Sequence, residues 1–313
     1  MTAIRDALAR YLTVRRALGT RLQEPATTLG YFADFLDLQG SKFITTDLAL
    51  RWACQPKHVQ RATWARRLTM VRQFAAWLSA FDPRTEVPPK RLLNARHRRS
   101  KPYIYTEQEI DHLMIEAALL PSPMGLRALT YVTLIGLLAV TGIRPGEVVA
   151  LNLSDVDLKN GILVIRQTKF GKSRFVPIND STCSALSDYA NRRNKLYTRL
   201  QTNSFFASER GTRLSLGSAR RTFAKVSCAV GLRTAKDGRR IGRGPRLQDF
   251  RHTFATRRII KWYQAGLDVN RELPKLTSYL GHSNVSHTYW YIEAVPELLQ
   301  FATEHMSRQG GAQ

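Results

Sequence analysis

Cysteine and histidine motifs are scarce in this chain of 313 residues. Its three cysteines, Cys54, Cys183 and Cys228, lie far apart and include no CxxC pair. An odd number without that spacing argues against a disulfide framework or a zinc site, and it favours buried thiols in a reducing compartment. The seven histidines include no HxxxH or HExxH pair. We therefore expect no cofactor and no metal held by protein side chains.

Long apolar runs are also missing. The longest, residues 128–140 (ALTYVTLIGLLAV), is too short to span a bilayer and is typical of a buried core helix. The first residues, MTAIRDALARYL, form an amphipathic pattern that includes Asp6, unlike the charged head and apolar core of a signal peptide. These features predict a soluble cytoplasmic protein with no membrane partner.

Acidic side chains are the third scarce feature. The chain has 24 Asp and Glu against 48 Lys and Arg, a formal charge of +24. Such an excess calls for a polyanion, and without a membrane segment nucleic acid is the favoured partner. We therefore expect a nucleic-acid partner inside the cell. The 43% of hydrophobic residues indicates a globular chain long enough for two domains.

Residues 1–82 are predicted to form a helical domain. Cap signals occur at Gly19, at Thr27 or Thr28, at Gly40, and at Thr45 or Thr46. Apolar residues at three- and four-residue steps from Trp64 to Leu78 predict a further helix, and its other face carries Arg61, Arg66, Arg67 and Arg72. A solvated charged face is one interpretation. The absence of acids between Lys57 and Ala80 favours a face that binds DNA phosphates.

Residues 83–105 are predicted to link two domains, because their four prolines cannot sustain a helix. The segment is either a flexible linker or a basic strap that lies along DNA. Its charge favours the strap, with basic residues at Lys90, Arg91, Arg96, Arg98, Arg99 and Lys101.

Residues 106–313 are predicted to form a second domain that is mainly α-helical with a small antiparallel β-sheet. It opens on a capping box, Thr106 with Glu109. Alternating apolar residues after Gly161 and again at 175–178 predict a β-hairpin. Helices are expected over 181–200, 218–230 and 248–260, in a short segment that ends at Gly281, and after Pro296.

Four motifs in this domain carry the candidate chemistry. They are TGIRPGEVVAL with Arg144, TKFGKSRFVPI with Lys169, FRHTFAT with Arg251, and LGHSNVSHTYWY with His282 and Tyr291. Arginine forks bind phosphate oxygens in pairs, and a tyrosine hydroxyl can act as a covalent nucleophile. In this order the motifs resemble those of the tyrosine recombinases, the integrase family of phage and transposon enzymes. The first domain is similar to the family's core-binding (SAM-like) domain, so the resemblance implies a two-domain DNA clamp.

The resemblance implies a site-specific recombinase that cuts and rejoins DNA through a 3′-phosphotyrosyl link, for integration or transposition of mobile DNA, without ATP or metal. Tyr291 is the expected nucleophile, because its spacing from His282 fits the family better than that of Tyr289. Arg144 and Arg251 are expected to hold the phosphate oxygens. Glu147 is expected to orient Arg144 or its helix rather than to contact the substrate.

A lysine of the hairpin is expected to protonate the leaving 5′-hydroxyl. Lys169 aligns with the family lysine, and Lys172 in the same turn is the alternative.

One position departs from the family. Gln248 stands three residues before Arg251, where the family usually carries a histidine. Glutamine can bond a phosphate oxygen but cannot exchange a proton near neutral pH. Proton transfer should then depend more on Lys169 and His282, while His252 is expected to pack. The same departure supports an alternative function, a catalytically weakened DNA-binding partner of a related active recombinase.

Assembly is also implied by the resemblance. Family members act as a homo-oligomer on DNA, a dimer on each site and a tetrameric synapse with a Holliday-junction intermediate, and a hetero-oligomer with related recombinases is a further option. The terminal VPELLQFATEHM helix either caps its own domain or docks on a neighbouring protomer, and we favour docking. A type IB topoisomerase would share the chemistry, but the compact domains and this helix argue against it.

Overall fold

The computed structural model describes residues 3–20, 22–93, 102–166, 173–197, 202–234, 244–282, 284–286, 288, 289 and 291. The chain folds into two compact units, residues 1–100 and 101–313. Within the described ranges no helix is long and apolar enough to cross a membrane.

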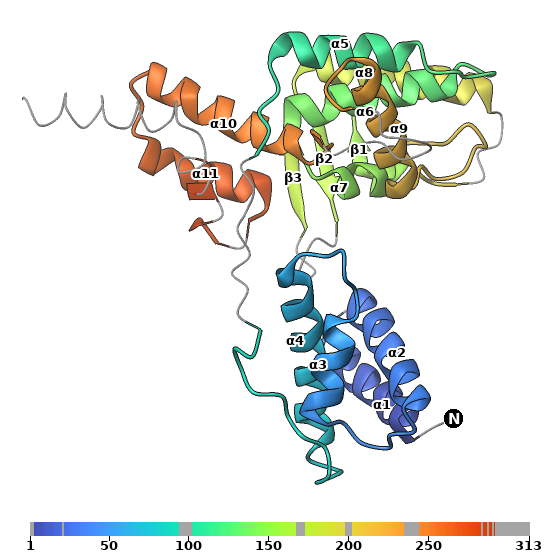
Figure 1. The fold of residues 1–313 in the computed structure, drawn as a ribbon. Coiled ribbons are helices and arrows are strands. Elements are labelled where there is room, and N and C mark those ends of the chain that lie inside the picture. Colours follow the sequence, from blue (N-terminus) through green and yellow to red (C-terminus); the bar gives the residue numbers. More distant parts are fainter. Residues whose placement is uncertain are drawn as a thin grey trace, which may run out of the picture. The chain divides into compact units, whose positions relative to one another are not determined.

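The first unit is a helical bundle built from α1 (Ala3–Ala17), α2 (Gln23–Leu38), α3 (Thr46–Cys54) and α4 (Arg61–Leu78) (Figure 1). Aromatic side chains from all four helices contribute to its core. The rings of Phe32 and Trp52 lie 5.0 Å apart, and those of Tyr11 and Phe74 lie 5.4 Å apart. The predicted apolar face of α4 is confirmed, because its buried residues are Leu68, Val71, Phe74, Ala75 and Leu78.

The helix caps of this unit were predicted with mixed success. Thr45 caps α3 as predicted, and its hydroxyl accepts from the N–H of Leu48 at 3.2 Å. The prediction that α2 begins at Thr27 or Thr28 was wrong, since α2 begins at Gln23 after a left-handed Leu22. Pro25 is tolerated in the first turn, where backbone N–H groups have no partner within the helix. The Thr27 hydroxyl instead donates to the Gln23 carbonyl at 3.3 Å.

The first half of the predicted linker packs on this unit. Glu86 Oε2 accepts from the N–H of Thr46 at 2.8 Å. Arg72 donates to the carbonyls of Pro88 and Pro89 at 2.8 and 3.1 Å. Residues 94–101, which include Arg98 and Arg99, lie outside the described residues.

The second unit is mostly helical. Its helices are α5 (Glu107–Ala118), α6 (Leu126–Thr141), α7 (Pro145–Ala150), α8 (Asp180–Leu196), α9 (Leu216–Ala229), α10 (Asp249–Gln264) and α11 (Val269–Leu280), with a 3₁₀ turn at Leu153–Asp155 (Figure 1). The apolar α6 is the central helix, in contact with α5, α8 and α10. The predicted capping box is confirmed by reciprocal bonds of 3.1 and 2.8 Å between Thr106 and Glu109.

A three-stranded antiparallel sheet lies beside these helices, in the order β1 (Val156–Asp157), β2 (Ile162–Ile165), β3 (Arg174–Pro177). The β2–β3 pair is the predicted hairpin, which is therefore confirmed. Val176 is buried, whereas Phe175 points to solvent. The predicted fold class, mainly α with a small antiparallel sheet, is correct.

A small separate core joins α10 to α11. Ile259 of α10 packs with Leu273, Leu276 and Leu280 of α11, and Tyr291 is buried in the same cluster. This cluster holds the last two sequence motifs together.

Candidate active site

The first motif makes a sharp turn between α6 and α7. Gly142 ends α6 with a φ of 61°, and a Cβ at this position would lie 2.6 Å from Cδ1 of Phe254. Both the backbone conformation and the available space therefore require glycine. Pro145 then occupies the first turn of α7, so Arg144 is held at the start of a helix.

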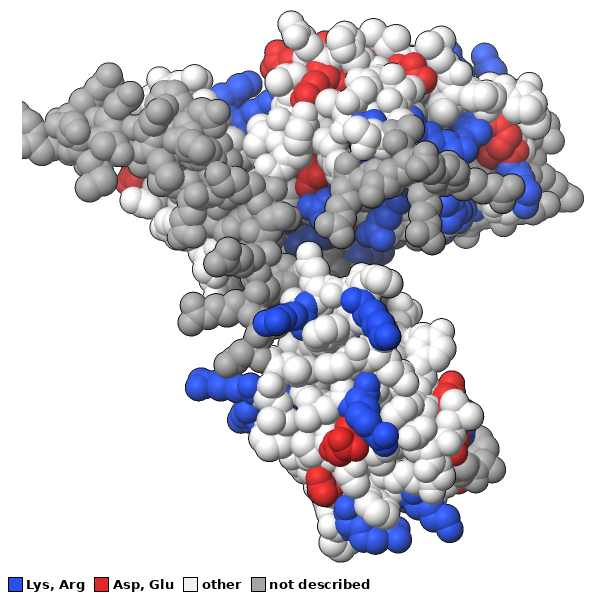
Figure 2. Space-filling model, in the orientation of Figure 1, with Lys and Arg blue, Asp and Glu red and all other residues white. Residues whose placement is uncertain are grey.

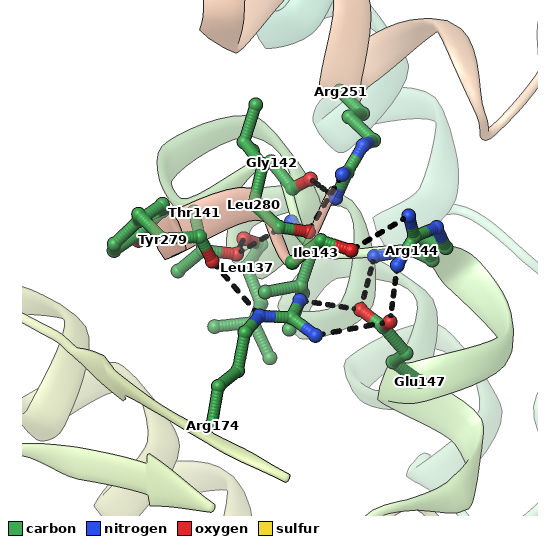
Figure 3. A network of polar contacts seen from close by, with 11 residues as sticks. Leu137, Thr141, Gly142, Ile143, Arg144, Glu147, Arg174, Arg251, Tyr279 and Leu280 are labelled. Atoms are coloured by element: carbon green, nitrogen blue, oxygen red, sulfur yellow. Dashed lines mark hydrogen bonds and ion pairs between the residues drawn. The ribbon is translucent and has the colours of Figure 1, made fainter. Parts of the chain in front are cut away.

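Glu147 binds Arg144 in the way that the sequence predicted. Its Oε2 accepts from the Arg144 backbone N–H at 3.0 Å, and its Oε1 accepts from Arg144 Nη1 at 2.8 Å (Figure 3). The same carboxylate also accepts from Arg174 of β3, at 2.7 Å from Nη2 and 3.2 Å from Nη1. Burial opposes the ionisation of Glu147, but Arg174 and Arg144 outweigh it and lower the pKa of Glu147 to about 2.

Arg174 is the site residue that the sequence reasoning missed. Its side chain is only 11% exposed. A usable signal was present in the hairpin: Arg174 lies two residues before the inward-facing Val176, and alternate residues of a strand point to the same face. An arginine on a buried face needs partners, and Glu147 supplies the charge.

Arg251 of α10 is the most deeply buried arginine of the site, with 1% exposure. Its Nη1 donates to the Gly142 carbonyl at 3.1 Å and its Nη2 to the Leu280 carbonyl at 2.6 Å (Figure 3). Burial and then the charge of Arg144 lower the pKa of Arg251 to about 10, so this guanidinium remains charged at neutral pH. Arg251 thus ties the turn that carries Arg144 to the end of α11.

Three guanidinium groups converge on the end of α11. Arg174 Nε donates to Tyr279 O at 2.8 Å, Arg251 to Leu280 O, and Arg144 Nη2 to Gly281 O at 3.3 Å. The carbonyls at a helix C-terminus carry partial negative charge, which favours these donors. Among the described residues three positive groups face one carboxylate here, so this part of the cluster carries an excess of positive charge beside the start of the last motif.

The last motif places the ring of Tyr291 near the rings of two histidines. Tyr291 is 2% exposed, and its ring lies 5.4 Å from that of His252 and 6.1 Å from the nearly parallel ring of His282. Burial lowers the pKa of His252 to about 4, so that imidazole is neutral and packs, as predicted. Tyr289, by contrast, is 42% exposed, and its hydroxyl donates to Asn270 at 3.2 Å.

Gln248 and the two candidate lysines complete the predicted site residues of this unit. Gln248 is half-buried at the N-terminus of α10, and its carbonyl accepts from the N–H of Arg251 at 3.2 Å. Lys169 and Lys172 lie outside the described residues, as does the predicted helix after Pro296.

Arg66, Arg67 and Arg72 of α4 have partners inside their own unit. Arg66 pairs with Glu24 of α2, Arg67 lies 3.7 Å from the centre of the Trp52 ring and donates to Trp52 O at 2.8 Å, and Arg72 is held by the proline carbonyls. Arg61 is exposed at the start of the helix. Figure 2 shows Lys and Arg side chains spread over the visible face of each unit, with fewer Asp and Glu.

The fold and the site together define a class of protein. A buried tyrosine lies against an imidazole, beside arginines that are anchored at one helix end. Such arginines can bind an anion next to the tyrosine hydroxyl, which can act as a nucleophile. The model of the phage integrase family matches residues 104–297. The chain belongs to this family of tyrosine recombinases.

Individual relatives agree with the family. The chain is 43% identical to "Putative integrase/recombinase y4rB" of Sinorhizobium fredii, over 99% of this chain and 98% of that protein. Two solved structures share the fold: the Tn1549 transposon integrase with transposon right end DNA (TM-score 0.63, 18% identity, 98% of this chain and 100% of that chain) and a lambda integrase tetramer bound to a Holliday junction (TM-score 0.63, 19% identity, 92% and 76%).

Proposed function

We propose that this protein is a site-specific recombinase that moves mobile DNA by integration or transposition. Tyr291 Oη attacks the scissile phosphorus, the bond from phosphorus to the 5′-oxygen breaks, and a 3′-phosphotyrosyl link forms. The link conserves the energy of the phosphodiester, so the reverse attack by a 5′-hydroxyl rejoins strands without ATP. The observation that best supports this proposal is the bond of Arg251 to both Gly142 and Leu280, which joins three sequence motifs at one place.

Each site residue has a proposed role. Arg144 and Arg251 hold the non-bridging oxygens, whose negative charge grows in the transition state. Among the described residues, the two carbonyl bonds of Arg251 engage two of its five N–H donors, which sets its orientation. Lys169 protonates the leaving 5′-oxygen, and Gln248 bonds a phosphate oxygen.

The partner is double-stranded DNA. We propose that residues 1–82 and 106–313 clamp a duplex, with the basic segment 83–105 between them, and that a dimer on each site pairs into a tetrameric synapse. The lambda integrase tetramer on a Holliday junction, which shares the fold, supports this arrangement. The proposed phosphate contacts of the first unit are the arginines of α4, of which Arg61 and Arg66 are exposed and Arg67 and Arg72 are half-buried, together with Arg98 and Arg99 outside the described residues.

The test is a covalent-trapping assay on nicked duplexes tiled across the DNA that flanks the protein's own coding sequence. A nick beside the scissile phosphate makes the fragment that carries the released 5′-hydroxyl short, so this fragment diffuses away and cannot rejoin. The protein then stays attached to the DNA and gives a band that resists detergent. Wild type and Tyr289→Phe should form the adduct, whereas Tyr291→Phe should form none. An adduct that persists in Tyr291→Phe would exclude Tyr291 as the nucleophile.

The same assay distinguishes the proposed function from the alternative, a DNA-binding partner that does not cleave DNA itself. Gln248 replaces the usual acid–base histidine, and a DNA-binding partner of an active recombinase should shift a duplex in a gel yet form no adduct. The partner function would replace our proposal if wild-type protein binds the duplex without forming an adduct, and if an adduct appears only when a related recombinase is added.

A further inference from the structure

Two buried threonines connect His282 to the body of α11. The Thr277 hydroxyl donates to the Leu273 carbonyl at 2.8 Å and lies 2.9 Å from the Thr288 hydroxyl. The Thr288 hydroxyl in turn lies 2.9 Å from Nδ1 of His282. Thr277 is 6% exposed and Thr288 is fully buried. The His282 backbone N–H also donates to the Thr277 carbonyl at 3.0 Å, which holds the backbone of His282 at the end of α11.

The direction of each hydrogen bond in this chain follows from the number of protons available. A carbonyl can only accept, so the single hydroxyl proton of Thr277 is used on Leu273. Thr288 must therefore donate its own proton to Thr277. The oxygen of Thr288 can then only accept from the imidazole, so Nδ1 of His282 carries a proton.

We propose that Thr277 and Thr288 are positioning residues that hold neutral His282 in the Nδ1–H tautomer, so that its Nε2 is a proton acceptor beside Tyr291. The catalytic part of this inference rests on the proposed function. As Tyr291 Oη attacks phosphorus, its proton passes to Nε2 of His282. The imidazolium that results has donors on both nitrogens, and Nε2–H then bonds the negative phosphorane oxygen.

The surroundings favour His282 over other groups for this step. Gln248 stands where the family usually has a histidine, and its amide cannot take a proton near neutral pH. His252 also packs against the Tyr291 ring, but in a buried position where the protonated form is strongly disfavoured. His282, with one nitrogen held by a hydroxyl, is the remaining described imidazole against the nucleophile.

The tautomer is measurable directly on the full chain without DNA. Protein with ¹⁵N-labelled histidine is examined by long-range proton–nitrogen NMR at a mildly alkaline pH, where an ordinary imidazole is neutral. His282→Phe identifies the signal that belongs to His282. Wild type and Thr288→Ser should show the Nδ1–H form, and Thr288→Val, which has the same shape without a hydroxyl, should lose that preference. A wild-type His282 in the Nε2–H form or in a mixture, or an unchanged tautomer in Thr288→Val, would overturn the inference.

Cleavage of the nicked duplex measures how the tautomer of His282 affects catalysis. Thr288→Val should slow adduct formation by about 10- to 100-fold, within the range of acid–base catalysis, while DNA affinity stays the same. Thr288→Ser should rescue the rate to within a few-fold. Thr130→Val is the matched control, because it removes a buried hydroxyl of α6 that bonds Tyr189 and Ala207, and it should leave the cleavage rate of the folded fraction unchanged.

The NMR and the cleavage measurements test different parts of the inference. Equal cleavage by wild type and Thr288→Val would refute the catalytic role of the threonine chain. If wild type forms no adduct, the proposed function fails, and the NMR result alone then decides whether the threonines set the tautomer.

Discussion

Replacement of Glu147 by glutamine tests how the site holds its arginines together. The Glu147 side chain is 12% exposed, and its single carboxylate pairs with Arg174, which is 11% exposed, and with the more accessible Arg144. Glutamine keeps the shape and one acceptor oxygen but removes the charge. Arg174 would then be a buried cation with no compensating anion among the described residues.

The expected loss follows from the pKa of Glu147. The value of about 2, against an ordinary 4.5, corresponds to about 3 kcal/mol in favour of the carboxylate, since one pKa unit is worth about 1.4 kcal/mol. Removal of one partner from a buried ion pair costs about 3 to 5 kcal/mol, which agrees. We therefore expect Glu147→Gln to lower the free energy of unfolding by about 3 kcal/mol at neutral pH.

The pH dependence of this loss has a definite sign. Because the folded-state pKa is depressed, the unfolded chain binds the proton first, and the contribution of Glu147 is complete above pH 4.5 and disappears as the pH falls toward 2. Glutamine does not titrate. The difference in stability between wild type and Glu147→Gln should therefore shrink across that window.

The assay is urea unfolding of the full chain, with hydrogen exchange of peptides from α7 and β3 so that the second unit is measured separately. Glu107→Gln is the matched control, since Glu107 is 87% exposed and lies 3.8 Å from Arg257, and it should change stability by less than about 0.5 kcal/mol. A loss in Glu147→Gln no larger than that of the control would refute the reasoning.

Three further predictions concern the same site. Arg174→Lys should slow cleavage by about tenfold or more, because one ammonium cannot bond Tyr279 O and both carboxylate oxygens. Arg166→Lys, at an arginine that is 57% exposed and pairs with Asp155, should not slow cleavage, and equal rates for the two variants would contradict this reasoning. Gln248→His should raise the cleavage rate if proton transfer is limiting, and an unchanged rate would remove that explanation. His252 has a folded pKa of about 4 against 6.5, so protonation of the unfolded chain should lower stability as the pH falls through this range. His252→Gln should flatten that decline in acid-unfolding curves, and an unaltered slope would show that another group causes it.

Much of the fold could be predicted because it depends on neighbours in sequence. The capping box of Thr106 and Glu109 spans one turn, and the left-handed Gly281 ends α11 where the sequence indicated. The start of α2 was misjudged for a related reason: Thr27 is a good cap in isolation, but a threonine hydroxyl inside a helix can also bond the carbonyl four residues earlier, as it does here.

Contacts between distant segments could not be predicted in the same way. The lack of acids near Arg66 along the chain gave no sign that Glu24 of α2 pairs with this proposed phosphate contact. Arg72 is likewise bound by proline carbonyls of the following segment. Counting charges along one helix says nothing about the side chains that a neighbouring helix brings to it.

For the active site, the sequence by itself determined which chemical groups are present and where each motif turns. Arg144 before Pro145, Arg251 on a helix and Tyr291 nine residues after His282 are all local statements. Only the tertiary structure decided that three arginines meet on consecutive carbonyls at the end of α11, that Arg174 shares Glu147 with Arg144, and that Thr288 returns to contact His282. The physical reason is that periodicity and capping depend on residues within one or two turns, whereas burial of a charged or polar group depends on partners from other segments, 27 to 137 residues away for these arginines.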